Sequence, residues 1–260
     1  MNLPIYQIDA FTSNIFEGNP AAVVPLKEMI EKKLMQKIAM ENNLSETAFI
    51  VKEGNNYKIR WFTPTCEVDL CGHATLASAH LVIFHLETGR NEVKFISTHH
   101  ELTVKNEDEY LSLSLPKAEN KTISISDELV KGLGKRPTEV YQSDDIMAVF
   151  DTAEDIKKLK PDFSILKNID TRGIIVTAQG DKADFVSRFF APAAGINEDP
   201  VTGSAHTKLI PFWAKKLGKN NLHAEQLSHR PGKIICRNLK DRVELLGNAR
   251  TYMEGTISTQ

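Results

Sequence analysis

One sequence pattern occurs twice in this chain of 260 residues. Arg60-Trp61-Phe62-Thr63-Pro64 leads to Cys71-Gly72-His73-Ala74, and Arg188-Phe189-Phe190-Ala191-Pro192 leads to Thr202-Gly203-Ser204-Ala205. A single long repeat indicates two similar domains, because a solenoid needs at least three short stacked units. The fold must therefore be one that two related halves can build, with the paired Gly-His and Gly-Ser turns directed towards one cleft.

The spacing between matching residues grows along the chain. An offset of 125 relates Val24, Phe49 and Val51 to Val149, Ile174 and Val176, and the offset becomes 128 at Arg60 and Arg188 and 131 at Gly72 and Gly203. We therefore expect the halves to align without a gap before Arg60. Two insertions of three residues in the second half then explain why the offset increases from 125 to 128 and then to 131.

Each half is expected to contain the same order of elements, because apolar spacing and turn residues recur in that order. In the first half these are a strand at 21–24, a helix at 27–42, a hairpin of strands at 47–52 and 57–62, and a helix at 74–86. In the second half they are a strand at 146–150, a helix at 153–166, strands at 173–177 and 184–190, and a helix at 204–217. Further strands are expected at 92–102 and 110–115.

These elements predict an α+β fold of two pseudo-symmetric domains, residues 1–116 and 117–260. Each domain is expected to be a curved, mostly antiparallel sheet around one apolar helix, because the helix after Gly72 has few large polar groups. The last residues are candidates for a return to the first domain.

The amino-acid composition argues against nucleic-acid and membrane partners. The chain has 32 basic and 34 acidic side chains, a net charge of −2, and therefore no electrostatic footprint for nucleic acid or an acidic membrane. Its three cysteines are too few for a disulfide framework, and no apolar run of 18 residues or leader pattern occurs. We expect a cytoplasmic protein without nucleic-acid or membrane partners.

The repeated glycines indicate a site for an anion. Gly72 and Gly203 both stand where a loop meets a helix, and the first N–H groups of a helix are unpaired and partially positive. Two such turns at one cleft would hold a carboxylate substrate and stabilise an enolate formed from it. Alternatively, the glycines merely permit a tight start to each helix.

Glu46 is a candidate base. It lies between the first helix and an apolar strand, and the offset of 125 makes Thr171 its counterpart. A base that takes a proton from carbon needs a dry cleft, where desolvation raises the pKa of a carboxylate. Alternatively, Glu46 is a solvent-exposed glutamate in a loop, which is the commoner situation for this residue type.

Three further side chains are candidates for the active site. Asp199 stands four positions before Gly203, where it is either a site residue or part of an Asx turn or cap. His73 titrates near neutrality, which suits a proton shuttle beside the anion site, or it is a hydrogen-bonding residue at the helix terminus. Ser204 occupies the matching place in the second half.

Other chemistries fit the sequence less well. The spacing of Cys66, Cys71 and His73 matches no common zinc pattern, and Ser204 lacks the Gly-x-Ser-x-Gly turn of a hydrolase. No Walker or dinucleotide glycine pattern occurs. The sequence therefore predicts neither a metal nor a cofactor.

Three motifs together resemble the PhzF-like family, named for an isomerase of phenazine biosynthesis. They are Asn43-Leu44-Ser45-Glu46-Thr47-Ala48-Phe49, Glu67-Val68-Asp69-Leu70-Cys71-Gly72-His73-Ala74-Thr75 and Glu198-Asp199-Pro200-Val201-Thr202-Gly203-Ser204-Ala205-His206, and Gly18-Asn19-Pro20-Ala21 fits too. The resemblance covers essentially the whole chain. It implies a fold similar to that of diaminopimelate epimerase, with the active site between two pseudo-symmetric halves, and a homodimer.

The resemblance also implies roles for individual residues. Glu46 would be the general acid and base, with His73, Asp199 and Ser204 completing the catalytic set. The turns around Gly72 and Gly203, which include Cys71, Ala74 and Thr202, would hold the substrate carboxylate. The phenazine enzyme moves a hydrogen within a dihydro-hydroxyanthranilate without metal or organic cofactor.

One departure leaves the substrate open. Cys71 and Thr202 occupy the places where related epimerases and proline racemases carry two catalytic cysteines, so this chain keeps one thiol of the pair. The leading hypothesis is a cofactor-independent isomerase of a small cyclic or amino carboxylate. The alternatives are a racemase, epimerase or dehydratase with Cys71 as base, and a binding or scaffold protein on the same fold.

Overall fold

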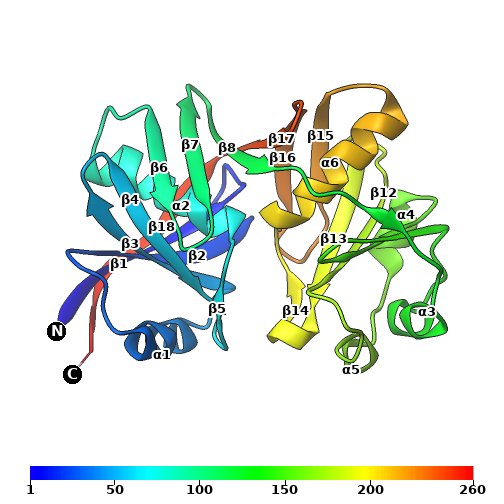
Figure 1. Ribbon diagram of the computed structural model, residues 1–260, viewed down its shortest axis with the longest axis horizontal. Coiled ribbons are helices and arrows are strands. Elements are labelled where there is room, and N and C mark those ends of the chain that lie inside the picture. The colour runs from blue at the N-terminus through cyan, green and yellow to red at the C-terminus, as the bar shows by residue number, and fades with distance from the viewer. Residues whose placement is uncertain (260) are drawn as a thin grey trace. The chain divides into compact units, whose positions relative to one another are not determined.

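A computed structural model describes residues 1–259. The chain divides into two compact units (Figure 1). The first unit contains residues 1–115 together with residues from 244 onward, and the second unit is Pro116–Val243. The chain therefore leaves the first unit once and returns to it near the C-terminus.

The first unit is a sheet around the helix α2. Its elements are β1 (Asn2–Ala10), β2 (Asn19–Leu26), α1 (Lys32–Asn42), β3 (Glu46–Glu53), β4 (Asn56–Phe62), β5 (Glu67–Val68), α2 (Gly72–Leu81), a π-helical turn (Val82–Leu86), β6 (Glu92–Ile96), β7 (Glu101–Glu107), β8 (Tyr110–Pro116) and β18 (Ala249–Ser258). Most neighbouring strands are antiparallel, but β2 pairs with β3 and β4 with β6 in parallel. The residues of α2 are buried except His80, because β1, β2, β3, β7 and β18 all contact this helix.

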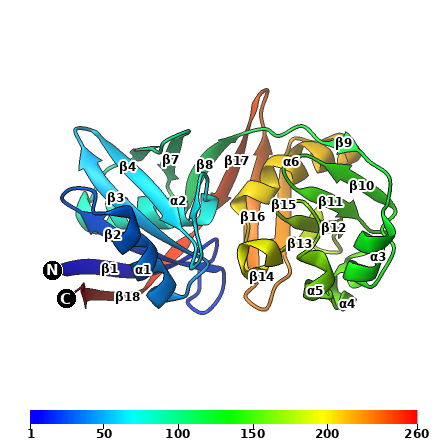
Figure 2. The ribbon, with the colours of Figure 1, turned by 60° about the horizontal axis from the view of Figure 1, so that its bottom comes forward.

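The second unit repeats this order (Figure 2). Its elements are β9 (Lys121–Thr122), α3 (Asp127–Leu133), β10 (Glu139–Gln142), β11 (Ile146–Val149), α4 (Ala153–Lys158), α5 (Phe163–Leu166), β12 (Ile174–Gln179), β13 (Phe185–Ala191), a 3-10 turn (Pro192–Ala194), β14 (Ile196–Asp199), α6 (Gly203–Leu217), β15 (Asn221–Gln226) and β16 (Gly232–Asn238). β17 (Arg242–Gly247) carries the chain back towards the first unit. β11 pairs with β12 in parallel, β12 with β13 antiparallel, and β13 with β15 in parallel.

The repeat is confirmed in the later part of each half. Gly72 and Gly203 are the first residues of α2 and α6, as the offset of 131 requires. Arg60 and Arg188 also correspond, because each forms an ion pair of 2.7 Å, with Glu67 in the first unit and Glu198 in the second.

The expected gapless alignment before Arg60 is wrong. Cross-strand register places Val24 beside Phe49 and Phe49 beside Arg60, whereas it places Ala148 beside Val176 and Val176 beside Arg188. Val24 and Phe49 belong to the apolar cluster of the first unit, and Ala148 and Val176 belong to that of the second. The offsets are thus 124 in the first strand and 127 in the second, so three residues are inserted between β11 and β12.

The single strand expected at 92–102 is wrong, because these residues belong to two antiparallel strands, β6 and β7, separated by a turn. Most other expectations hold with shifted limits. The predicted hairpin closes at Glu53 and Asn56, with Gly54 at a φ of 59°. The helix predicted at 27–42 begins only at Lys32, and the one predicted at 153–166 is divided into α4 and α5 around Pro161, which cannot supply a helical N–H. The strands β1, β5, β9, β10 and β14 to β18 were not predicted. No helix within residues 1–259 is long and apolar enough to cross a bilayer.

Candidate active site

Glu46 and His73 meet in the first unit. Glu46 is the first residue of β3, and His73 is the second residue of α2. Their side chains are 13% and 3% exposed, and Glu46 Oε2 lies 3.2 Å from His73 Nε2. The start of a strand and the start of a buried helix therefore bring a carboxylate and an imidazole together, with the carboxylate still within reach of a ligand.

Asn19 determines which nitrogen of His73 carries the proton. Asn19, the first residue of β2, has its amide nitrogen 3.1 Å from His73 Nδ1. An amide NH₂ group only donates, so Nδ1 accepts and the proton of the neutral ring resides on Nε2, the atom beside Glu46. The protonated Nε2 of His73 therefore lies 3.2 Å from Glu46 Oε2, in a contact that does not have the geometry of a hydrogen bond.

The expectation that His73 titrates near neutrality is wrong for the folded chain. Burial lowers the pKa of His73 from 6.5 to about 3, because the ring is removed from water. The imidazole therefore stays neutral at physiological pH. It can orient Glu46, but it does not exchange protons with solvent in that range.

Cys71 lies beside the same imidazole. Its sulfur is 3.5 Å from His73 Nδ1, and the residue immediately precedes α2 without capping it through its side chain. One ligand atom each of Glu46, Cys71 and His73 lies within 4.8 Å of the others, a donor set of the kind zinc uses. Asn19 already donates to His73 Nδ1, however, and Nε2 carries the proton, so the imidazole offers no lone pair in this arrangement.

The cysteine pattern considered in the sequence is not assembled. Cys66 is exposed, and its sulfur lies 3.5 Å from the hydroxyl of Thr63. It takes no part in the group formed by Glu46, Cys71 and His73.

In the second unit, hydrogen bonds fix the turn that leads into α6. The Thr202 hydroxyl donates to Asp199 Oδ2 at 2.5 Å, and the Thr202 N–H donates to Gln226 Oε1 at 2.8 Å. Gln226 Nε2 in turn donates to the Asp199 carbonyl at 2.8 Å. Asp199 is only 6% exposed. Because Thr202 is engaged with Asp199, its side chain does not cap α6.

Ser204 contacts a group of charged residues that sequence reasoning missed. Arg172 Nη1 donates to Ser204 Oγ at 3.1 Å, and the same guanidinium is paired with Asp145. Lys208, on α6, donates to Asp145 Oδ2 at 2.8 Å. The side chains of Asp145 and Lys208 are 0% and 3% exposed, so two buried charges neutralise each other beside Ser204.

A positional signal for these residues exists in the sequence. Asp145 directly precedes β11, and Arg172 is two residues before β12. In the first unit Asn19 and Glu46 start the corresponding parallel strands β2 and β3. Polar residues just before two apolar runs therefore gather at the amino ends of the central parallel pair in each half.

Glu46 has no acidic equivalent in the second unit. The corrected offset of 127 makes Gly173 its counterpart, not Thr171, whose hydroxyl donates to the Gly173 carbonyl. A Cβ at Gly173 would lie 2.2 Å from Phe189 Cζ. The ring of Phe189 thus occupies the space that a side chain would need there.

Both helix starts keep the character of an anion site. Neither α2 nor α6 has a side-chain cap, and the first intrahelical bond of α2 runs from Thr75 N–H to the Cys71 carbonyl. The N–H groups of Gly72, His73 and Ala74 precede that bond. The first unit therefore gathers Glu46, Cys71, Gly72, His73 and Ala74, and the second gathers Asp199, Thr202, Gly203 and Ser204.

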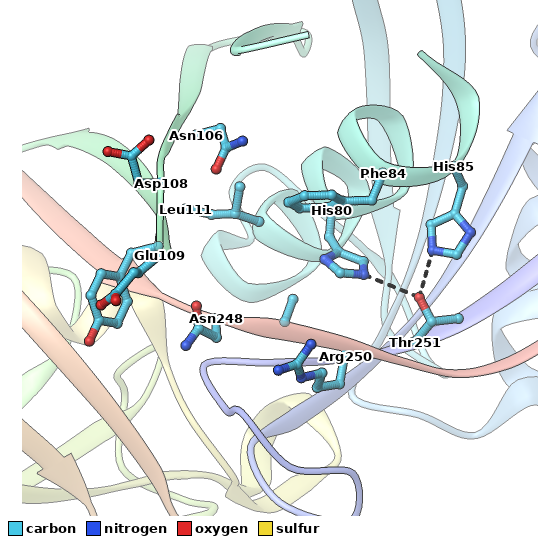
Figure 3. Close-up of a pocket in the computed structure, with 12 residues that line it drawn as sticks. His80, Phe84, His85, Asn106, Asp108, Glu109, Leu111, Asn248, Arg250 and Thr251 are labelled. Carbon is cyan, nitrogen blue, oxygen red and sulfur yellow. Dashed lines mark hydrogen bonds between the residues drawn. The ribbon is translucent and has the colours of Figure 1, made fainter. Parts of the chain in front are cut away.

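A separate cavity of about 700 Å³ opens at the other end of α2 (Figure 3). His80 and His85 both place Nε2 near the Thr251 hydroxyl, at 3.2 and 2.9 Å. Asn106, Asp108, Glu109 and Arg250 are among its other lining residues. None of the residues expected at the active site lines this cavity.

Comparison with known proteins gives consistent matches over the whole chain. The model of a family described as "Phenazine biosynthesis-like protein" matches residues 8–255. An uncharacterized isomerase of Pseudomonas aeruginosa is 46% identical over 257 residues, which is 99% of each chain. A crystal structure of a phenazine biosynthesis protein of the PhzF family from Enterococcus faecalis superposes with a TM-score of 0.95 at 45% identity, covering 99% of this chain and 100% of that one.

The fold extends to more distant enzymes. A hydroxyproline epimerase of Agrobacterium vitis, crystallised with trans-4-hydroxy-L-proline, superposes with a TM-score of 0.66. It covers 99% of this chain and 93% of that one, at 9% identity. At this identity the likeness concerns the fold alone, and it agrees with the expected architecture of two similar halves.

Proposed function

This chain belongs to the phenazine biosynthesis-like protein family, and we propose that it moves a proton between carbon atoms of a small cyclic or amino carboxylate. Curated relatives that are 44 to 46% identical to this chain are named isomerases, and the proposed reaction belongs to the same class. The observation that carries the proposal is Glu46, whose carboxylate lies 3.2 Å from a neutral, buried imidazole and remains 13% exposed.

Glu46 is the proposed acid and base. Its carboxylate takes the proton from an activated C–H bond, and the electron pair of that bond enters the conjugated carboxylate system as an enolate. The proton held by Glu46 can exchange with water before Glu46 returns a proton to a different carbon, and no external oxidant or reductant is needed. The neutral ring of His73 has its Nε2 atom 3.2 Å from the carboxylate, and in this proposal it holds the carboxylate in place for the reaction.

The substrate carboxylate is assigned to the helix starts. The N–H groups of Gly72 and Gly203 begin helices without side-chain caps, and Cys71, Ala74 and Thr202 flank them. Such N–H groups bind anions and stabilise developing negative charge. We assign Asp199 and Ser204 to the same reaction because they match the family motif.

Exchange of carbon-bound hydrogen in deuterated water tests this function. A panel of cyclic, amino and hydroxy carboxylates is incubated with the protein, and deuterium uptake is followed by proton NMR. We expect uptake into at least one of them, and none with Glu46→Gln. A wild-type protein that binds carboxylates in calorimetry yet exchanges none of their hydrogens would instead be a binding protein.

A second candidate is a racemase, epimerase or dehydratase that uses Cys71 as its base. The position of the Cys71 sulfur, 3.5 Å from His73 Nδ1, favours it. The neutral state of His73 removes one source of the positive charge that stabilises a thiolate, but the start of α2, which Cys71 precedes, is another such source. Cys71→Ala distinguishes the two, since this substitution abolishes exchange by a thiol base and spares exchange by Glu46.

A further inference from the structure

We propose that Arg172 is a positioning residue that fixes the direction of the Ser204 hydroxyl, so that its hydrogen is presented to an oxygen of the substrate. The proposal rests on the proposed function for the role of Ser204. Arg172 itself acts only through that hydroxyl and lies outside the family motifs considered above.

The chemistry of the two groups dictates the direction of their hydrogen bond. A guanidinium has five N–H donors and no acceptor, so Ser204 Oγ must accept the bond of 3.1 Å from Arg172 Nη1. The hydrogen of the hydroxyl must then point elsewhere. Within residues 1–259, no side chain or carbonyl accepts it, which leaves this hydrogen available to a ligand at the start of α6.

Arg172 is itself held firmly. Its Nη2 donates to Asp145, its Nε lies 3.4 Å from Asp144 Oδ2, and its guanidinium lies 5.6 Å from the centre of the Phe189 ring. Lys208 supplies a second cation to the same Asp145 oxygen. Because Asp145 is fully buried, the guanidinium is anchored although 40% of its side chain is exposed.

Fixing the direction of the Ser204 hydroxyl should affect the transition state more than it affects substrate binding. A donor that is oriented in advance stabilises negative charge on a substrate oxygen without reorganising during the reaction. The unfixed hydroxyl of an ordinary serine would have to lose that rotational freedom in the transition state. Arg172 should therefore influence turnover more than substrate affinity.

A thiol at position 204 tests the contact without any ligand. In Ser204→Cys, donation by Arg172 should stabilise the thiolate and bring the thiol pKa below its ordinary value of about 8.5. Adding Arg172→Met should raise that pKa by about one unit or more. The pH dependence of alkylation by iodoacetamide gives the pKa, with the peptide around position 204 followed by mass spectrometry so that other cysteines do not interfere.

Two variants serve as controls in this experiment. Arg136→Met removes an exposed arginine from the same unit and should leave the thiol pKa unchanged. Arg172→Lys keeps a cation beside Asp145, should fold if Arg172→Met does not, and should keep the pKa low. If the thiol pKa is the same with and without a cation at position 172, Arg172 does not contact the side chain at position 204 and the proposal is wrong.

A double-mutant cycle tests the role in the reaction. With Ser204 present, Arg172→Met should lower kcat of the exchange reaction about tenfold and change KM by less than threefold, as loss of a transition-state hydrogen bond predicts. In the Ser204→Ala background the same substitution should have no further effect. An equal loss in both backgrounds would show that Arg172 supports the structure instead.

The two proposals fail in different ways. If the wild-type protein exchanges no hydrogen, the proposed function fails, and the positioning role fails with it, whereas the thiol experiment still decides whether Arg172 contacts position 204. If exchange occurs but the double-mutant cycle shows no coupling, only the role of Arg172 is wrong.

Discussion

At the scale of single residues, the two halves differ where chemistry is proposed. Glu46 corresponds to Gly173, His73 to Ser204 and Cys71 to Thr202. The duplicated scaffold therefore keeps the backbone features of both helix starts and changes the side chains around them. In the proposed function, this asymmetry leaves Glu46 of the first unit as the carboxylate base.

Replacing Cys71 with alanine should be mild. The proposed reaction uses no thiol, and the substitution removes one buried sulfur that contacts His73 at 3.5 Å. We expect exchange activity within about fivefold of wild type, because the loss is smaller than the ~10²-fold that removal of an acid or base causes. A folded Cys71→Ala that binds carboxylates but has lost all activity would favour the thiol-base alternative.

Replacing Gly203 with valine should abolish carboxylate binding. The branched side chain would cover the N–H groups at the start of α6, which the ligand must approach closely. Backbone strain does not contribute, since Gly203 is the first residue of a right-handed helix. Calorimetry with benzoate as probe should show at least a tenfold loss of affinity.

Gly255→Val is a suitable control for that variant. A Cβ at Gly255 meets no atom within 4 Å, so the same change in side chain tests only the general effect of adding valine. Circular dichroism establishes that both variants fold. Normal benzoate binding by a folded Gly203→Val would remove this helix start from the site.

At the scale of elements, the start of β2 depends on a glycine. Gly18 has a φ of 66°, and a Cβ there would lie 2.2 Å from the Ala10 carbonyl oxygen. It directly precedes Asn19, which orients His73. Both backbone conformation and space therefore require glycine beside the site.

A matched pair of substitutions separates these two requirements. Gly54 has a similar φ of 59° but open space around its missing Cβ. Gly54→Ala should cost about 1 kcal/mol of unfolding free energy through the left-handed backbone alone. Gly18→Ala should cost clearly more in urea unfolding, because it adds a steric clash. Equal costs would mean that β1 and β2 separate easily at this point.

The two central helices carry buried histidines that make stability depend on pH. Burial lowers the pKa of His206 from 6.5 to about 4, although its hydrogen bond to the Thr202 carbonyl opposes the shift, and His73 is lowered to about 3. From pH 6.5 down to about 4, the unfolded chain binds protons that the folded chain does not. The free energy of unfolding must therefore fall as pH falls through this range, by about 1.4 kcal/mol for each unit of pKa difference.

His206→Asn should reduce that dependence. Asparagine can keep a hydrogen bond to the Thr202 carbonyl but does not titrate, so the slope of unfolding free energy against pH between 4 and 6.5 should become smaller. The exposed His229→Asn provides the matched control and should leave the slope unchanged. An unchanged slope in His206→Asn would mean that this ring is protonated in the folded protein.

At the scale of the whole molecule, the repeated motifs allowed the two related halves and their helix starts to be predicted. Gly72 and Gly203 each follow a strand with the same Arg-aromatic-Phe-x-Pro pattern and start a helix, and the likeness remains recognisable despite the three-residue insertion between Arg188 and Gly203. The offset in the earlier strands could not be predicted. β2, β3, β11 and β12 are parallel strands buried on both faces, so their apolar runs lack the alternation that reveals register.

The candidate site was predicted from the sequence only where a motif marked it. Glu46, His73, Asp199 and Ser204 lie in conspicuous segments, whereas Arg172 and Asp145 stand in ordinary polar loops that the parallel pairing of β11 and β12 brings together. The low pKa of His73 also depends on how many atoms cover it. Sequence alone does not contain that quantity.

Deuterium exchange by Glu46→Gln tests the central claim most directly. Glutamine keeps the size and polarity of the side chain beside His73 but cannot accept a proton from carbon. With the substrate found in the carboxylate screen, we predict a kcat lower by ~10²–10⁴-fold and an affinity within about tenfold of wild type. A folded Glu46→Gln that binds the substrate and exchanges its hydrogen at nearly the wild-type rate would contradict the assignment of Glu46 as the acid and base.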